Sequence, residues 1–347
     1  MTVLRSGFTT GACAAAAAKA ATIALLENRV VPSVDIPFPD GSRSTFAVES
    51  AQLTPATASV KKFAGDDPDT TDGMLIVATV ERNDSGEIQF AAGEGVGIVT
   101  KPGLQIPPGQ PAINPAPRAM IRAALREVTS EGLTVTISIP EGRERAAKTF
   151  NPRLGIVDGL SILGSTGHVR PFSVPALRDA LVCTLNVAVA SGVTAPVLVP
   201  GHTGRRAALA HFKVTPEQVI EVSNEWGFML EQAARQAWSH LLLVGHPGKL
   251  AKLAEGHWET HSAQSPSVVP FIRLLADSLG IQTSSEVKTA EGLFDELPAE
   301  QRRILADRLA VDIQKAVAKH TGKAIAVMLV NMKGDSLGTG GELSPWQ

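Results

Sequence analysis

A pattern of apolar strand, glycine turn and helix repeats through the second half of the chain, from about residue 160 to residue 331. Short apolar runs such as Pro196–Val199 and His240–Val244 each end in a glycine turn and are followed by a helical pattern. Such alternation predicts a parallel sheet with helices on both faces. We therefore expect residues 154–347 to form an α/β domain with a parallel, Rossmann-like sheet.

Three of these turns are candidates for ligand binding. They read GSTG at 164–167, GHTG at 201–204 and GHPG at 245–248. Ligands of open α/β sheets bind beyond the carboxyl ends of the strands, where glycine lets the backbone approach closely. The turns favour a nucleotide-like or adenosyl ligand, unless they are only tight strand-to-helix connections; neither a full dinucleotide fingerprint nor a P-loop is present. The candidate residues for this ligand are Gly164, Ser165, Thr166, Gly201, Gly245 and His246.

The first 153 residues carry a different pattern. A helix is expected from about Gly11 to Glu27, and a β-hairpin around Asp40-Gly41. A second hairpin is expected to join Met74–Arg82 to Glu87–Ala92, followed by a helix over 117–129 and a strand over 133–140. Residues 1–153 are therefore predicted to form an α+β domain with a mainly antiparallel sheet and helices on one side.

A run rich in glycine and proline extends from Gly93 to Arg118. Glycine permits unusual backbone angles and proline restricts them, so the run is suited to a fixed shape. It lies between a strand pattern and a helix pattern, and its strong polar residues are Lys101, Asn114 and Arg118. We interpret it as a rigid loop that presents backbone amides and cations to a ligand; the alternative is a structural connection.

Four aspartates lie in one short loop, Phe63–Gly73. They can bind calcium or magnesium, although the spacing of an EF-hand is missing. They can also stabilise turns through hydrogen bonds to the backbone. In a third reading one of them faces a reaction centre, and the catalytic candidates are then Asp66, Asp67 and, from the second domain, His202.

Composition excludes several classes of protein. The formal charge is -2, aromatic residues make up 4% and tyrosine is absent, so broad nucleic-acid or membrane-surface binding is not expected. Cys13 and Cys183 are predicted to be buried free thiols, because two cysteines do not complete a zinc site. We expect a cytoplasmic protein without its own metal ion, and read the alanine-rich N-terminal segment as a buried helix. Alanine-rich helices can pack within or between subunits, so a homo-oligomer is possible.

Four long segments have an unusual composition, namely Ser6–Ala21, Ala64–Gly73, Gly93–Ile121 and Lys148–Pro171. Together they resemble the signature sequences of the cobalt-precorrin-5B C(1)-methyltransferase family of cobalamin biosynthesis. The resemblance continues more loosely through PGHTG, GHPGKL and ETHS. It implies methyl transfer from S-adenosylmethionine to carbon 1 of the macrocycle cobalt-precorrin-5B, giving cobalt-precorrin-6A.

A carboxylate-rich macrocycle requires scattered cations, and arginine suits carboxylate because it can form two parallel hydrogen bonds. Any cobalt would arrive with this substrate. The candidate residues for the macrocycle are Thr9, Thr10, Lys101, Asn114, Arg118 and Arg153, with Arg122 as a further cation.

Two other functions remain open at this point. A nucleotide-dependent kinase or dehydrogenase would use Gly93–Gly97 as a phosphate loop and the acidic loop for magnesium. A tetrapyrrole carrier would bind the macrocycle without turnover.

Overall fold

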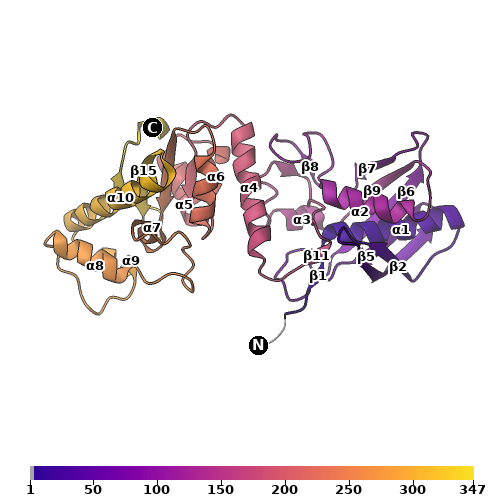
Figure 1. Ribbon diagram of the computed structural model, residues 1–347, viewed down its shortest axis with the longest axis horizontal. Coiled ribbons are helices and arrows are strands. Elements are labelled where there is room, and N and C mark those ends of the chain that lie inside the picture. The colour runs from indigo at the N-terminus through magenta and orange to yellow at the C-terminus, as the bar shows by residue number, and fades with distance from the viewer. Residues whose placement is uncertain (1–3) are drawn as a thin grey trace. The chain divides into compact units, whose positions relative to one another are not determined.

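The computed structural model describes residues 4–347 and divides the chain into two compact units after Val174 (Figure 1). The division lies further along the chain than the expected boundary at 153/154. Two short strands beyond residue 153 explain this, because they pair with strands of the first unit. These are β10 (Ile156–Val157), which pairs with β8 (Ile98–Val99), and β11 (His168–Val169), which pairs with β1 (Gly7–Phe8). The GSTG turn therefore lies in the first unit, and its predicted place in the parallel sheet is wrong.

The main sheet of the first unit has five strands in the order β4-β5-β6-β9-β7. Their bounds are Ser50–Leu53 for β4, Ala56–Lys61 for β5, Leu75–Arg82 for β6, Ile88–Ala92 for β7 and Leu133–Ser138 for β9. All neighbours are antiparallel except β7 and β9, which are parallel. The mainly antiparallel sheet is confirmed. The predicted hairpin of β6 with β7 is wrong, because β9, with alternate residues fully buried, lies between them.

A two-stranded hairpin covers part of the same core. It consists of β2 (Ser33–Pro37) and β3 (Arg43–Ala47), and its turn contains Gly41 with a positive φ of 84°. This hairpin is confirmed as the sequence predicts, because an Asp-Gly turn favours that backbone geometry.

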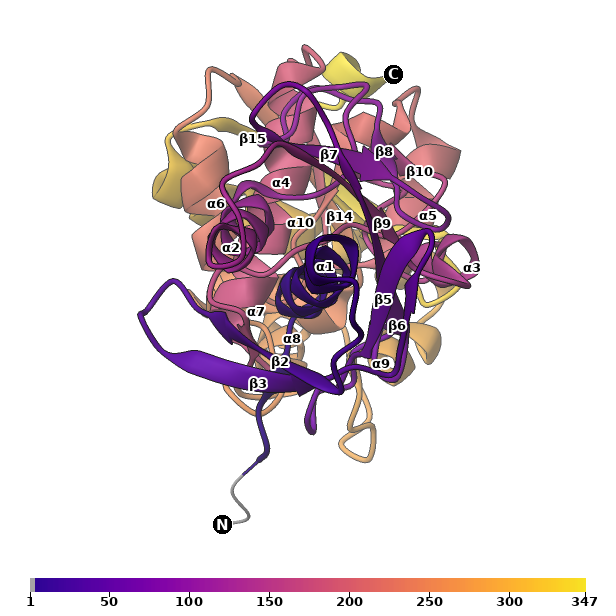
Figure 2. The same ribbon diagram turned by 90° about the vertical axis from the view of Figure 1, so that its right-hand side faces the viewer.

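Helix α1 (Thr10–Glu27) is the centre of the first unit. Figure 2 looks along it and shows it enclosed by α2 (Pro115–Arg126), by the β2–β3 hairpin and by β5 and β6. By length and composition the helix could span a membrane, but 72% of it is buried, as befits a core helix. Its alanines let α2 approach closely because they add little side-chain volume. A short helix, α3 (Gly142–Ala146), completes the unit.

The second unit contains a five-stranded sheet in the order β13-β12-β14-β15-β16. The bounds are Val197–Val199 for β12, Val219–Glu221 for β13, His240–Gly245 for β14, Ala324–Val330 for β15 and Ser336–Gly340 for β16. Neighbouring strands are parallel except for β16, which pairs antiparallel with β15. The predicted parallel sheet is confirmed, and β16 was not expected.

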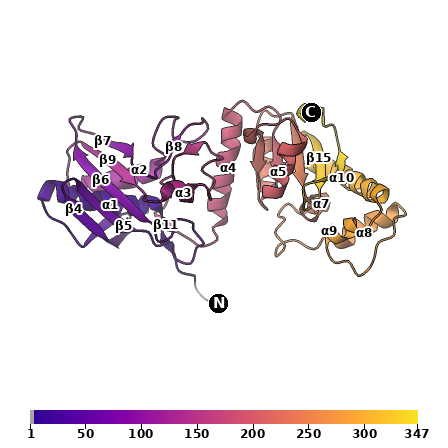
Figure 3. The ribbon, with the colours of Figure 1, turned by 180° about the vertical axis from the view of Figure 1, so that it is seen from behind.

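Helices cover both faces of this sheet. Alternate residues point to opposite faces, so that Leu243 of β14 lies in a core with α6 and α10, whereas Val244 lies in a core with α5. Figures 1 and 3 show α5 and α10 with β15 between them. The helices are α4 (Val174–Ala190), α5 (His202–His211), α6 (Trp226–Ala234), α7 (Pro247–Ala254), α8 (Val269–Ser278), α9 (Ala290–Asp295) and α10 (Ala299–Thr321), with short 3₁₀ helices at Pro216–Gln218 and Ser344–Trp346.

The strand order of the second unit contains a reversal. From β12 the chain crosses through α5 to β13 on one side, and it then returns to β14 on the other side of β12. In open α/β sheets the crevice at such a reversal, beyond the carboxyl ends of the strands, is the usual place for a ligand.

Candidate functional site

The reversal brings together four predicted residues at one edge of the second unit. Gly201 and His202 follow β12, while Gly245 ends β14 and His246 caps α7. The two turns touch, since a Cβ atom on Gly245 would lie 2.9 Å from Cδ of Pro200. The side chain of His202 is exposed. These residues thus lie at the carboxyl ends of β12 and β14, where the sequence predicts an adenosyl ligand.

The glycines of the GHTG turn have two different environments. A Cβ atom on Gly201 would meet nothing within 4 Å, so the backbone there is accessible. A Cβ atom on Gly204 would lie 2.6 Å from the carbonyl oxygen of Val244, so this glycine lets α5 pack closely on the sheet. Access for a ligand and close helix packing are two of the tasks that glycines perform in dinucleotide-binding turns.

His246 has both ring nitrogens engaged. Its Nδ1 accepts the N–H of Gly248 at 3.0 Å, so the ring proton resides on Nε2, which donates to Oε2 of Glu291 at 2.7 Å. Oε1 of Glu291 accepts the N–H of Met332, in the loop after β15, at 3.1 Å. His246 and Glu291 together therefore link α7, α9 and the loop after β15, and the imidazole is held in one orientation at the carboxyl end of β14.

Glu221 is a residue at this edge that the sequence interpretation missed. It is the last residue of β13 and lies opposite Val199, the last residue of β12. In dinucleotide-binding folds an acidic residue about 20 positions beyond the glycine turn accepts the ribose hydroxyls. Glu221 stands at that distance from Gly201, and this spacing is the signal that could have identified it.

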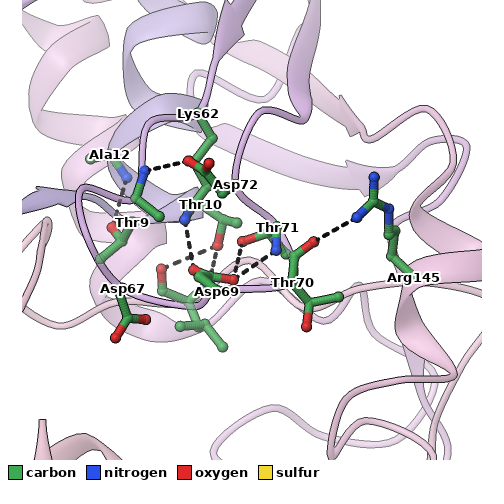
Figure 4. A network of polar contacts seen from close by, with 12 residues as sticks. Thr9, Thr10, Ala12, Lys62, Asp67, Asp69, Thr70, Thr71, Asp72 and Arg145 are labelled. Atoms are coloured by element: carbon green, nitrogen blue, oxygen red, sulfur yellow. Dashed lines mark hydrogen bonds and ion pairs between the residues drawn. The ribbon is translucent and has the colours of Figure 1, made fainter. Parts of the chain in front are cut away.

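The acidic loop of the first unit forms a network around a buried lysine (Figure 4). The side chain of Lys62 is fully buried, and its Nζ lies 2.7 Å from Oδ2 of Asp69. Oδ1 of Asp69 accepts both the N–H and the hydroxyl of Thr71, each at 2.7 Å. Burial favours the neutral form of Asp69, but the charge of Lys62 and these hydrogen bonds outweigh it and lower its pKa. Burial raises the pKa of the nearby Cys13 thiol to about 12.

The other three aspartates of the loop have separate partners. Asp66 pairs with Arg5, with Nη2 at 2.8 Å from Oδ1, and hydrogen bonds from Arg5 lower its pKa. Asp67 accepts the N–H of Phe172 at 3.1 Å, and Asp72 accepts the N–H of Ala64 at 2.7 Å. Among residues 4–347, no group of three or more His, Cys, Asp or Glu side chains is placed to hold a metal ion. The contacts agree with turn and capping roles, and catalysis by Asp66 or Asp67 stays a prediction.

The GSTG turn closes over the N-terminus of α1. Thr9 caps the helix by accepting the N–H of Ala12, and its own N–H donates to Gly167. The hydroxyl of Thr10 bonds to both backbone groups of Leu163, at 3.0 and 3.3 Å. A Cβ atom on Gly164 would lie 2.4 Å from the side chain of Thr9. Both threonines are nearly fully buried and the N–H groups of Gly11, Ala12 and Cys13 have partners, so these contacts hold the fold together.

Ser165 and Thr166 complete the GSTG turn. Both belong to the first unit, whereas Gly201, Gly245 and His246 belong to the second. The six residues predicted to hold the adenosyl ligand therefore do not form one set of strand-to-helix turns. Thr166 instead accepts the N–H of His168 through its hydroxyl at 3.3 Å, at the start of β11.

The loop rich in glycine and proline is held in place by backbone hydrogen bonds. Gly97 donates to Leu160 at 2.9 Å, and Ile162 donates to Ala112 at 2.8 Å. Asn114 donates its N–H to Ile162 and precedes α2 as its N-terminal capping residue. These contacts tie the loop to residues 160–162, and the binding of a ligand by a rigid loop stays a prediction.

The predicted cations lie at two places on the first unit. Arg118 and Arg122, one turn apart on α2, both lie over the ring of Phe90, at 5.3 and 4.9 Å from its centroid. Arg118 also donates to the carbonyl oxygens of Ile113 and Pro111, and burial followed by the charge of Arg122 lowers its pKa.

The second place surrounds the turn 150–155. Arg153 lies over the ring of Phe150 at 5.1 Å. The side chain of Lys101 packs on Gly155, where a Cβ atom would lie 2.4 Å from Cγ of the lysine. At both places an arginine thus lies over an aromatic ring, a pairing compatible with a flat ligand fringed by carboxylates.

Comparison with known proteins identifies related sequences over the whole chain. The CbiD family model matches residues 1–171. The chain is 54% identical to "Cobalt-precorrin-5B C(1)-methyltransferase" of Syntrophotalea carbinolica, with 100% of both chains covered. It is 46% identical to the protein of the same name from Desulfitobacterium hafniense, covering 84% of this chain and 78% of that one. A crystal structure of the cobalamin biosynthesis protein cbiD from Archaeoglobus fulgidus matches with a TM-score of 0.41 and 29% identity, covering 80% of this chain and 85% of that one.

Proposed function

This chain belongs to the CbiD family of cobalt-precorrin-5B C(1)-methyltransferases, and we propose that it methylates carbon 1 of cobalt-precorrin-5B in cobalamin biosynthesis. The observation that carries this proposal is the 54% identity along the full length of both chains. The product would be cobalt-precorrin-6A, and S-adenosylmethionine would be the methyl donor. We expect the reaction to take place in the cytoplasm.

We propose that the crevice beyond β12 and β14 holds the donor. The accessible backbone of Gly201 supports this, as do the touching turns at Gly245 and the fixed imidazole of His246. Glu221, at the end of β13, is placed to accept the hydroxyls of the donor's ribose. We assign no donor contact to the turn Gly164–Thr166, because it closes the N-terminus of α1 in the first unit.

We propose that the first unit binds the macrocycle through its cations. Arg118 and Arg122 lie beside Phe90, and Lys101 and Arg153 lie around the turn 150–155. Guanidinium groups next to aromatic rings can hold carboxylates while the rings contact the flat apolar surface. Asn114, at the end of the rigid loop, would add a polar contact.

S-adenosylmethionine supplies an electrophilic methyl group when it is bound. In the reaction the bond from carbon 1 to the methyl carbon forms as the bond from sulfur to that carbon breaks, which leaves S-adenosylhomocysteine. The protein contributes mainly by positioning the reacting atoms. Of the three catalytic candidates, His202 is exposed beside the donor crevice. Asp67 accepts a backbone N–H, and Asp66 is paired with Arg5. His202 and Asp67 are accordingly the first choices for proton transfer.

Calorimetric titration with S-adenosylhomocysteine tests the donor proposal, with magnesium-ATP as the control ligand. We expect saturable binding of S-adenosylhomocysteine alone. Incubation of the protein with cobalt-precorrin-5B and isotopically labelled donor then tests methyl transfer. Binding of magnesium-ATP without any labelled product would refute the methyltransferase and favour a kinase.

A further inference from the structure

The second unit contains a cavity of about 280 Å³ beside the first turn of α7. Its buried lining residues, called the floor below, include residues from three helices, namely Lys252 of α7, Val269 of α8 and Ala290 of α9. Its exposed lining residues, called the rim, include Lys288 and several residues with hydroxyl groups. The lining residues are Gly248, Lys252, Ser262, Ser265, Pro266, Ser267, Val268, Val269, Lys288, Thr289 and Ala290.

Lys252 is only 5% exposed at the floor of this cavity. Its Nζ donates to the carbonyl oxygen of Thr260 at 3.1 Å and to the hydroxyl of Ser265 at 2.7 Å, and both acceptors are neutral. Within residues 4–347, neither Lys252 nor Lys288 forms an ion pair. A buried ammonium group without a counter-ion is costly, since neutral acceptors replace only part of its hydration. An anion from outside the chain would compensate it.

The charged groups around the cavity reinforce this conclusion. No aspartate or glutamate lies among the described residues that line it. The neighbouring carboxylates have other partners, because Glu291 bonds to His246 and to Met332, and Glu259 accepts the N–H of His261. Burial and then the charge of Lys252 lower the pKa of Lys249 on the same helix, against the opposing effect of Glu259.

The cavity lies next to His246, which follows the carboxyl end of β14. A Cβ atom on Gly248, which lines the cavity, would lie 3.0 Å from Nδ1 of His246 and 3.7 Å from Cβ of Ala290. A molecule bound at the carboxyl ends of β12 and β14 could therefore extend one anionic group past His246 towards Lys252.

We propose that this cavity is a carboxylate-binding subsite in which Lys252 forms the ion pair at the floor and Lys288 a second contact at the rim. The identity of the ligand rests on the proposed function, which supplies two sources of carboxylate. One source is the set of acidic side chains of the macrocycle, and the other is the methionine carboxylate of the donor. The ammonium group of Lys252 has three N–H groups and uses two of them for Thr260 and Ser265, so one remains for either carboxylate.

Propionate is the probe for the subsite, because it carries one carboxylate and no other charge. Thermal unfolding of the full chain is followed by tryptophan fluorescence in propionate and in chloride of equal ionic strength. We expect propionate to raise the melting temperature of the wild type and of the control Lys315→Met, whose side chain is exposed on α10. Lys252→Met should abolish this protection and Lys288→Met should reduce it. Equal protection of a folded Lys252→Met protein, or none of the wild type, would overturn the subsite.

Lys288→Met also identifies the source, since an exposed residue can be replaced without unfolding the unit. About tenfold weaker binding of S-adenosylhomocysteine, with unchanged binding of 5′-methylthioadenosine, assigns the carboxylate to the donor. About a tenfold higher KM for the macrocycle, with unchanged donor binding, assigns it to the macrocycle. If Lys288→Met leaves the affinity for S-adenosylhomocysteine, the affinity for 5′-methylthioadenosine and the KM for the macrocycle all unchanged, the proposal is contradicted. Methyl transfer without propionate protection would refute the subsite alone, and propionate protection without donor binding or transfer would refute the function alone.

Discussion

The pair of Lys62 and Asp69 should contribute strongly to the stability of the first unit. Asp69→Asn tests this cleanly, because asparagine keeps an oxygen for the two hydrogen bonds from Thr71 and changes only the group facing Lys62. The variant leaves a fully buried ammonium group without its counter-ion. Loss of one partner of a buried pair costs about 3–5 kcal/mol. Asp69 is 24% exposed, so we expect the lower figure of about 2–3 kcal/mol after allowance for solvent screening.

The two units can be observed separately in one experiment. All four tryptophans, Trp226, Trp238, Trp258 and Trp346, lie in the second unit, so their fluorescence follows that unit alone. Hydrogen exchange of peptides from α1 follows the first unit. With a urea dependence of about 2 kcal/mol per molar, the α1 transition of Asp69→Asn should move down by roughly 1 M. The fluorescence transition should remain in place.

The dependence on pH gives a second measurement of the same pair. The folded pKa of Asp69 lies below its unfolded value, so its contribution is complete above the unfolded pKa of about 4 and is lost as the pH falls through the folded pKa. The difference between wild type and Asp69→Asn should therefore shrink in acid. Asp66→Asn is the matched control, because Asp66 pairs with the exposed Arg5 and should shift the α1 transition far less. An α1 transition that Asp69→Asn leaves unchanged, or a difference that persists in acid, would refute the reasoning.

Three further predictions concern single side chains. Gly204→Ala should destabilise the second unit by about 1–3 kcal/mol in a fluorescence-detected urea titration, because its Cβ meets the carbonyl of Val244. Gly201→Ala should unfold like the wild type but lose affinity for S-adenosylhomocysteine in calorimetry. Loss of stability in Gly201→Ala, with loss of affinity in Gly204→Ala, would contradict these roles. Glu221→Gln should weaken S-adenosylhomocysteine and 5′-methylthioadenosine alike by about tenfold, as both carry the ribose, and an unchanged affinity would remove Glu221 from the site. Cys13, with its pKa raised to about 12, should resist alkylation by iodoacetamide at pH 8 until the protein is unfolded, and rapid labelling of the native thiol would show that it is not buried.

Local patterns in the sequence predicted much of the fold. The apolar runs around Val197–Val199 and His240–Gly245 form parallel strands because each is buried on both faces, and this property is visible as an unbroken apolar run. The Asp40-Gly41 hairpin followed from turn chemistry alone. Strands and turns that depend on one segment and its immediate neighbour could therefore be predicted from the sequence.

Contacts between segments far apart in the sequence could not be predicted in this way. Residues 133–138 insert between β6 and β7, and the turn at Gly164 belongs to α1, although both places looked locally like other motifs. Lys62 gave no signal, since its burial depends on the sheet, on α1 and on the acidic loop together. At the candidate site of the second unit, the positions of Gly201, Gly245 and His246 after the strands could be predicted from the turns, while the position of Glu221 beside them follows only from the pairing of β13 with β12.

The pairing of β1 with β11 has a consequence for the synthesis of the protein. Helix α1 leaves the ribosome before the strands and the helix α2 that cover it, and by length and composition it resembles a membrane span. The carbonyl groups that close its N-terminus, at Leu163 and Gly167, are made about 150 residues later. Most of the first unit must therefore be translated before its central helix is covered. We expect the nascent helix to be accessible to chaperones during that interval, for a time set by the rate at which the rest of the unit is translated.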